Sequence, residues 1–296
     1  MEPQDLTVIF IGGHEHSGST ILDLYLQRHP KVVSVGEAGK LERYTRGAQR
    51  DRTTSHCRCG SVFRECPFWS RVAEEAARLG RPLDTMGFGA DDADYGASSE
   101  VFFQAVAEAA QCTTIVDSSK GIRRLLRLQT ETRLRIVPVH VSRDLYGFLA
   151  SHKKRKNIGR LDAVSLSWRY ISSNVRFSNA LRRVPHVSSR LEDLAANPSS
   201  VLQAIYELAG VAPLAVTSSD ASRDEPIHNL AGNRLLRGQP ERLSPDRAAP
   251  TVPLFRPPFD TFFRLVSRAI DVYPRDVTHV TTMSDAGKSI VSVPIK

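Results

Sequence analysis

The chain has 296 residues, a formal net charge of +8 and 41% hydrophobic residues, which is typical of a soluble globular protein with one large α/β domain or two small ones. No apolar run is long enough to cross a membrane, and Met1–Asp5 lacks the basic start of a signal peptide, so we expect a cytoplasmic protein. The positive charge favours anionic ligands, but no basic block interleaved with aromatic residues indicates a nucleic-acid partner.

The first segment of the chain predicts a phosphate-binding loop. An apolar, β-branched run over residues 6–11 stops at two glycines, and residues 19–28 have helical periodicity. A strand–loop–helix of this kind presents backbone N–H groups to an anion at the helix start. The spacing Gly13-x-x-x-x-Gly18 nearly matches a nucleoside-triphosphate loop, but Ser19 replaces the lysine that neutralises the outer phosphates. The loop therefore keeps the phosphate cradle without the part that is specific to triphosphates.

Strand and helix patterns alternate along the rest of the chain. The alternation predicts an α/β fold, with a P-loop-like, doubly wound parallel sheet flanked by helices, in a single domain over 1–296. Residues 40–97 are interpreted as a cap insertion, 211–258 as a loop region that closes over the site, and 278–296 as a loose tail. The expected strands cover 6–11, 32–35, 112–116, 134–141 and 187–191, and the expected helices cover 19–28, 67–79, 99–111, 121–131, 144–154, 162–184, 198–209 and 259–272.

Polar residues follow the expected strands, and sheets of this kind bind ligands outside the carboxyl ends of their strands. These residues are 14–20, Glu37, 117–120, 142–144 and 190–193. After the 134–141 strand, the spacing of Arg143, Ser151 and Arg155 allows the three to surround one anion. The alternative is that Arg143 pairs with a local carboxylate and that Ser151 is an ordinary helix-surface residue.

Three of the four cysteines form the pattern Cys57-x-Cys59-x6-Cys66, with His56 beside them. A metal site is conceivable, but the pattern lacks the paired C-x-x-C turns of ordinary zinc sites. A local disulfide or simple packing is the favoured interpretation. Cys112 is expected to open a buried strand and to lie in the core.

Several of these segments, in this order, resemble motifs of bacterial-type sulfotransferases that use 3′-phosphoadenosine 5′-phosphosulfate (PAPS). Residues 17–20 resemble the 5′-phosphosulfate loop, and Arg143 with Ser151 resembles the 3′-phosphate motif. The resemblance implies sulfuryl transfer from PAPS to a hydroxyl of a small-molecule or carbohydrate acceptor, with no metal required. Further similar segments are 57–69, 190–198 and 228–234.

The resemblance also implies roles for individual residues. The segment 29–37 is similar to one in tyrosylprotein sulfotransferases and implies that Glu37 is the catalytic base, while Lys120 would stabilise charge on the bridging oxygen. His16 stands where relatives carry Lys or Arg beside the leaving group and would act there when protonated. The residues implied to bind PAPS are His14, His16, Ser17, Gly18, Ser19, Thr20, Arg143, Ser151, Arg155, Asn233 and Arg234.

Alternatives stay open for these residues. Glu37 could cap a helix or pair with Lys40 or Arg43, Lys120 could be an ordinary helix-start lysine, and a histidine (His14, His16 or His228) could be the base. Leu191 stands where relatives often carry a tyrosine that contacts adenosine. Trp168 is a candidate substitute for that ring, although its place in a helix favours the core.

Two other functions compete with sulfuryl transfer. One is a P-loop kinase or nucleotidase. Two features disfavour it: Ser19 replaces the lysine, and no strand ends in a clear Mg²⁺-binding aspartate, although Asp117 is a candidate. The other is a non-catalytic nucleotide-binding protein, in which Glu37 would be incidental. The sequence leaves the acceptor and the oligomeric state open, with a homodimer as one option.

Overall fold

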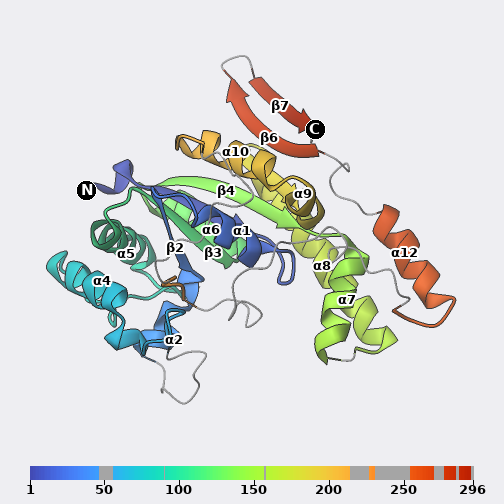
Figure 1. Cartoon of the computed structure of the whole chain (residues 1–296), viewed down its shortest axis with the longest axis horizontal. Helices are drawn as coiled ribbons and strands as arrows, with labels where there is room; N and C mark the ends of the chain where they lie inside the picture. The colour runs from blue at the N-terminus through green and yellow to red at the C-terminus, as the bar shows by residue number, and fades with distance from the viewer. Residues whose placement is uncertain are drawn as a thin grey trace.

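A computed structural model places a seven-stranded sheet at the centre of the molecule, in the order β2-β3-β1-β4-β5-β6-β7 (Figure 1). The first five strands in this order are parallel, and β6 and β7 are antiparallel. The strands are β1 (Thr7–Gly12), β2 (Val32–Gly36), β3 (Thr114–Lys120), β4 (Arg135–Ser142), β5 (His186–Arg190), β6 (Val277–Ser284) and β7 (Gly287–Pro294).

The structure describes residues 1–46, 56–89, 91–156, 158–213, 227–230, 254–269, 277–284 and 287–294, and for Arg155, 268–269, β6 and β7 the backbone alone. Within this part, no helix is both long and apolar enough for a membrane span. The helices are α1 (Ser19–Leu26), α2 (Leu41–Thr45), α4 (Pro67–Arg78), α5 (Tyr95–Ala110), α6 (Ile122–Glu131), α7 (Leu145–Lys156), α8 (Arg160–Leu181), α9 (Leu191–Ala196), α10 (Pro198–Ala209) and α12 (Phe259–Ala269).

The side chains of β1 point alternately to the two faces of the sheet, as strand geometry requires. Val8 and Phe10 pack in a core with α4, α5 and α6, whereas Ile9 and Ile11 pack in a second core with α1, α9 and α10. Helices therefore cover both faces, and all six residues of β1 are buried. Burial on both faces explains the continuous apolar run and confirms the predicted α/β fold with a parallel sheet flanked by helices.

The prediction of a loose tail over 278–296 is wrong. Residues 277–284 and 287–294 form the antiparallel pair β6 and β7, and β6 pairs with β5 from His186 to Ser188. The segment is rich in valine and threonine, which favour strands, and it pairs with an edge of the sheet that would otherwise present unpaired backbone groups. Figure 1 shows the pair at the top of the view, next to α10.

Two predicted boundaries also differ from the structure. β3 continues through residues 117–120, which the sequence placed after the strand, and half-buried Cys112 precedes it rather than opening a buried strand. Asp117 and Ser118 can lie inside the strand because both are buried and hydrogen-bonded. α5 begins at Tyr95, before the expected start at residue 99.

The segment predicted as a cap, 40–97, packs against α5 through aromatic side chains. Phe63 contacts Trp69 at 5.2 Å between ring centroids, and Trp69 stacks on Phe102 of α5 at 6.3 Å. These rings belong to the same core as Val8 and Phe10 of β1. The described part of the segment thus packs on the face of the sheet to which Val8 and Phe10 point.

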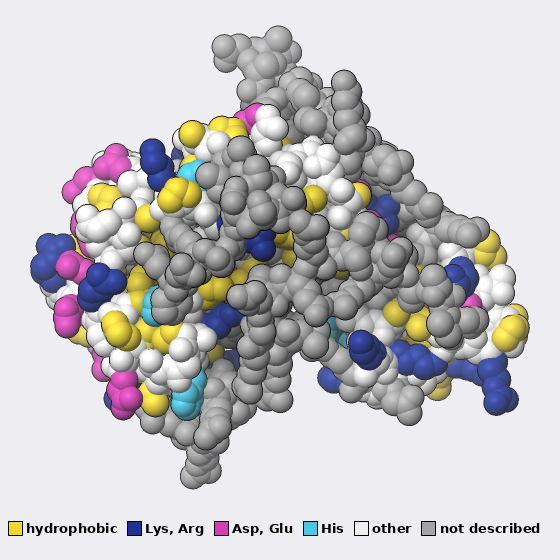
Figure 2. All heavy atoms as spheres, in the orientation of Figure 1, with side chains coloured by type: hydrophobic (Ala, Val, Ile, Leu, Met, Phe, Trp, Pro, Cys, Tyr) yellow, Lys and Arg dark blue, Asp and Glu magenta, His cyan; other side chains and the backbone are white. Residues whose placement is uncertain are grey.

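The opposite end of the molecule carries α7, α8 and α12. Figure 2 shows Lys and Arg side chains gathered at the lower right of the view, and Lys154, Lys156 and Arg160 are the exposed basic residues at the junction of α7 and α8. Trp168 on α8 is 71% exposed, so its expected place in the core is wrong.

Candidate anion-binding and catalytic site

The loop between β1 and α1 has a backbone conformation that requires glycine at two positions. Gly13 has φ 143°, and a Cβ there would lie 2.2 Å from the Val141 carbonyl oxygen. Gly18 has φ 96°, and a Cβ there would lie 2.5 Å from Leu191 Cδ1. Larger residues would clash at both positions and would be strained in this region of φ. The loop therefore crosses directly over the ends of β4 and β5.

The same loop offers hydrogen-bond donors to an anion. Within the described residues, the backbone N–H groups of Ser17 and Gly18 donate to no backbone carbonyl, and no side chain caps α1 at Gly18. The first N–H groups of a helix have no partner inside it, and the helix dipole adds positive charge at this end. Ser17 and Ser19 are buried here, while Gly18 and Thr20 are half-buried. These residues fit a phosphate or phosphosulfate group.

The two histidines of the loop have different surroundings. The His14 ring packs edge-on against Phe148 and Tyr170, at 5.1 and 5.5 Å between centroids. Burial lowers the pKa of His14, which favours the neutral ring at pH 7. His16 is half-buried, has φ 64°, and places its Nδ1 3.4 Å from Ser151 Oγ. The structure therefore brings together His16 and Ser151, two residues predicted to bind PAPS, and places His14 among aromatic rings.

Arg143 follows β4, and Tyr170 of α8 fixes its backbone. The Arg143 N–H donates to the Tyr170 hydroxyl at 2.7 Å, and that hydroxyl donates to the Arg143 carbonyl. Ser151 lies two turns into the next helix, as predicted, with Arg155 one turn later on the same helix. The side chain of Arg155 and the whole of Asn233 and Arg234 lie outside the described residues.

The segment after β5 holds a half-buried acidic group beside an arginine. Arg190 Nε lies 3.4 Å from Glu192 Oε2, and the Asp144 N–H donates to Glu192 Oε1 at 3.3 Å. Burial and the neighbouring Asp144 raise the pKa of Glu192 to about 7. Leu191 packs on Gly18, so this residue contributes an apolar contact to the loop.

Glu37 and Lys120, the predicted base and the predicted charge-stabilising lysine, form an ion pair. Lys120 Nζ lies 2.7 Å from Glu37 Oε1, and Lys40 pairs with the other carboxylate oxygen. Burial alone would raise the pKa of Glu37, but Lys120 and Lys40 outweigh it and lower the pKa. The Gly13 N–H donates to the Lys120 carbonyl at 3.2 Å. The pair therefore lies directly beside the phosphate loop.

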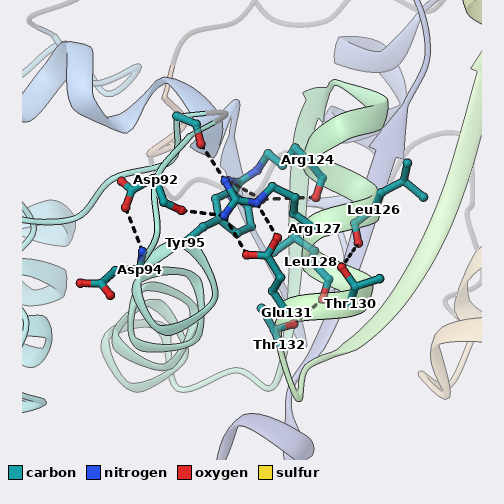
Figure 3. A network of polar contacts seen from close by, with 11 residues as sticks. Asp92, Asp94, Tyr95, Arg124, Leu126, Arg127, Leu128, Thr130, Glu131 and Thr132 are labelled. Carbon is teal, nitrogen blue, oxygen red and sulfur yellow. Dashed lines mark hydrogen bonds and ion pairs between the residues drawn. The ribbon is translucent and has the colours of Figure 1, made fainter.

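A polar network holds the end of β3 that carries Lys120. Arg124 of α6 donates through Nε to Asp117 Oδ2 at 2.8 Å and through a terminal nitrogen to the Tyr95 hydroxyl at 3.2 Å. Next to it, Arg127 lies over the Tyr95 ring and binds Glu131, as Figure 3 shows. Asp117 also accepts hydrogen bonds from the Ser119 N–H and hydroxyl. These contacts tie α6, α5 and β3 together behind the ion pair.

Sequence reasoning missed Asp23, the fully buried acidic residue of α1. Its carboxylate accepts hydrogen bonds from Gln27 Nε2 at 2.9 Å, the Ser118 hydroxyl at 2.9 Å and Asn229 Nδ2 at 3.3 Å. Asp23 therefore connects α1 to β3 and to the segment 227–230. One signal could have revealed it, because Asp23 is the only charged residue in the apolar run 21–26.

Asp23 predicts a specific pH dependence of stability. Burial raises its pKa from 3.8 to about 6, against the hydrogen bonds that lower it. The folded protein thus holds a proton that the unfolded chain releases, so this contribution is complete below pH 3.8 and is lost as pH rises through about 6. The loss amounts to about 3 kcal/mol. Denaturant unfolding of Asp23→Asn, measured from below pH 3.8 to above pH 6, should not show this loss of stability.

The wild type serves as the control for this measurement. Burial lowers the pKa of His140 to about 4, which gives a pH slope of the opposite sign in both proteins. The difference between wild type and Asp23→Asn therefore isolates Asp23. Parallel stability profiles for the two proteins would contradict the assigned protonation of this carboxyl.

Comparison with known proteins adds the fold. The sulfotransferase domain of an olefin synthase from Synechococcus PCC 7002 superimposes with a TM-score of 0.54 at 16% sequence identity, over 90% of this chain and 95% of that domain. The chain therefore has the fold of a sulfotransferase domain. No protein-family model matches the sequence, and no curated protein matches it significantly.

Two other solved structures are also similar. A sulfotransferase domain from the curacin biosynthetic pathway matches with a TM-score of 0.49 at 17% identity, over 88% of this chain and 97% of that one. A sulfotransferase of Mycobacterium avium matches with a TM-score of 0.41 at 14% identity, over 70% of this chain and 64% of that one.

Proposed function

We propose that this chain is a sulfotransferase that transfers the sulfuryl group of PAPS to a hydroxyl of a small-molecule or carbohydrate acceptor. The observation that carries the proposal is the 2.7 Å pair of Glu37 and Lys120, next to a phosphate loop whose Gly13 N–H binds the Lys120 carbonyl. A carboxylate, a cation and an anion cradle at one sheet edge are the groups that sulfuryl transfer requires. The fold shared with a sulfotransferase domain supports the proposal.

In the proposed reaction, Glu37 accepts the proton of the acceptor hydroxyl while the acceptor oxygen bonds to sulfur. The bond from sulfur to the leaving phosphate oxygen breaks, and adenosine 3′,5′-bisphosphate leaves. Lys120 and Lys40 lower the pKa of Glu37, so the carboxylate is ionised at neutral pH and ready to accept the proton. The backbone carbonyl of Lys120 binds the Gly13 N–H, and in the proposed reaction the Lys120 ammonium group would stabilise the charge that develops on the leaving oxygen.

The rest of the proposed site binds the donor. The N–H groups and hydroxyls of residues 17–20 would bind the 5′ phosphosulfate, with His16 beside it. Arg143, Ser151 and Arg155 would bind the 3′-phosphate, and Asn233 and Arg234 would close over that end. The proposed transfer uses no metal, since Lys120 and the loop N–H groups supply the positive charge.

The environment of Asp117 disfavours the kinase alternative. A P-loop kinase needs an acidic side chain near the strand ends that is available to Mg²⁺. Asp117 is fully buried, and its two oxygens bind Arg124 and Ser119. Its carboxylate is therefore committed to the network behind Lys120.

Donor binding provides the test. We expect titration calorimetry without Mg²⁺ to show that adenosine 3′,5′-bisphosphate binds more tightly than adenosine 5′-monophosphate or ATP. Arg143→Ala should weaken bisphosphate binding by about 10- to 100-fold and remove most of the preference over the monophosphate, because a charged hydrogen bond contributes about 1.5–3 kcal/mol. Arg176→Ala, which changes an exposed arginine of α8, is the control. Tighter binding of ATP with Mg²⁺ would contradict the proposal.

A further inference from the structure

Three cysteines and one histidine from distant parts of the chain converge at the edge of the sheet. Cys59 Sγ lies 3.7 Å from Cys66 Sγ, and His228 Nδ1 lies 3.2 Å from Cys66 Sγ and 3.7 Å from Cys57 Sγ. All four ligand atoms lie within 4.8 Å of one another. Cys57 and Cys66 are buried, and Cys59 and His228 are half-buried.

These distances fit a tetrahedral metal ion rather than a disulfide. Bonds of about 2.3 Å from zinc to sulfur and about 2.0 Å from zinc to nitrogen place neighbouring ligand atoms about 3.5–3.8 Å apart. A disulfide needs about 2.05 Å between sulfurs, and none of the three cysteines is in a disulfide. The sequence favoured a local disulfide or simple packing, and the disulfide is not formed. His56, the sequence neighbour of Cys57, is not in the cluster.

The surroundings hold these four side chains in place. The Gly60 N–H donates to the Cys57 carbonyl at 3.0 Å, and Gly60 has φ 97°, so a tight turn presents Cys57 and Cys59 together. The Phe68 ring stacks on His228 at 5.2 Å between centroids. The ring orientation is thus fixed by packing, as the ligands of a metal site require.

We propose that Cys57, Cys59, Cys66 and His228 bind one zinc ion. Three sulfurs and one imidazole nitrogen are a ligand set that zinc prefers, and four protein ligands leave no open coordination position. Such a closed site is structural rather than catalytic. The proposal is independent of the sulfotransferase function and of the metal-free transfer at Glu37.

The zinc would attach the segment 227–230 to the sheet edge that carries Glu37. The Leu230 N–H donates to the Val35 carbonyl, and the Glu37 N–H donates to the Leu230 carbonyl, both at 2.9 Å. The neighbouring Asn229 donates to Asp23. A zinc ion that joins His228 to the cysteines of the cap closes a long loop of the chain. The free energy of metal binding then contributes to folding.

The first experiment measures metal content. The full chain, purified in reducing buffer without chelator, should contain about one zinc per chain by elemental mass spectrometry. Cys66→Ser and His228→Ala should lose the zinc, whereas His228→Cys should keep it, because a Cys₄ set also binds zinc. Cys112→Ser and His56→Ala are matched controls outside the cluster and should keep it. Zinc retained in both Cys66→Ser and His228→Ala would overturn the assignment.

A second experiment does not depend on how the variants fold. Wild-type chain depleted of metal and titrated with Co²⁺ under reducing conditions should develop the visible bands of tetrahedral cobalt and a near-ultraviolet thiolate charge-transfer band. Zinc should then abolish both. Wild-type protein that holds no zinc as purified and gives no thiolate band with Co²⁺ would overturn the proposal, as would a native disulfide between any two of these cysteines.

Discussion

Glu37→Gln is expected to lower kcat for sulfuryl transfer by about 10²- to 10⁴-fold, the usual contribution of a positioned general base. The amide keeps the size of the side chain and can still accept a hydrogen bond from Lys120, but it cannot take the acceptor proton. Binding of adenosine 3′,5′-bisphosphate should change little, because the predicted donor contacts lie in the loop and after β4. Initial rates with labelled PAPS and calorimetry on the same preparation measure the two effects.

The pH profile sharpens this test. Lys120 and Lys40 lower the pKa of Glu37, so activity should fall only as the pH drops through that lowered value. Lys40→Met removes one of the two cations and should move this acidic limb to higher pH. Glu75→Gln, an acidic residue of α4 away from the site, is the control. Unchanged turnover in Glu37→Gln would exclude Glu37 as the base. Wild-type protein that binds the bisphosphate but shows no turnover would favour a non-catalytic nucleotide-binding protein.

Arg124→Met should destabilise the fold by about 3–5 kcal/mol, because it leaves the Asp117 carboxylate buried without its ion-pair partner. Arg124 is 8% exposed and Asp117 is fully buried, and the same guanidinium holds the Tyr95 hydroxyl. Denaturant unfolding followed by circular dichroism measures the loss. Arg133→Met, which breaks the pair of an arginine 65% exposed with Glu100, is the matched control and should leave stability unchanged.

A double mutant separates the ion pair from the packing of the long side chain. In Asp117→Asn with Arg124→Met, the lone buried charge is gone, so the double variant should be less destabilised than the sum of the two single changes. Strict additivity would mean that the loss comes from packing against Tyr95 and Phe88 rather than from the stranded carboxylate.

The predictable parts of this molecule are those whose signal is contiguous in the sequence. Apolar runs over 6–11 and 134–141 give two buried strands, and Gly13 and Gly18 mark the loop because Gly13 lies close to the backbone of β4 and Gly18 to the side chain of Leu191. These features predict the α/β fold, which the structure confirms. The roles of Glu37 and Lys120 stay predictions, although the structure brings the two side chains into contact.

The parts that escaped prediction depend on contacts between distant segments. The partner of the three cysteines is His228, far along the chain, rather than the adjacent His56. Asp23 is stable in the core because Ser118 and Asn229 donate to it from other segments. The strands β6 and β7 escaped because strand propensity depends strongly on context, and their structure depends on the pairing of β6 with β5 and of β7 with β6.

The bridge between Gly36 and Leu230 has a consequence for the order of folding. The loop and α1 follow β1 directly, so contacts within this unit are local and form early, whereas the backbone bonds that hold Glu37 require a segment synthesised much later. A nascent chain can thus form β1 and α1 before it contains the segment that holds the backbone of Glu37. We expect hydrogen exchange during refolding to protect the Leu22 amide before the Glu37 amide.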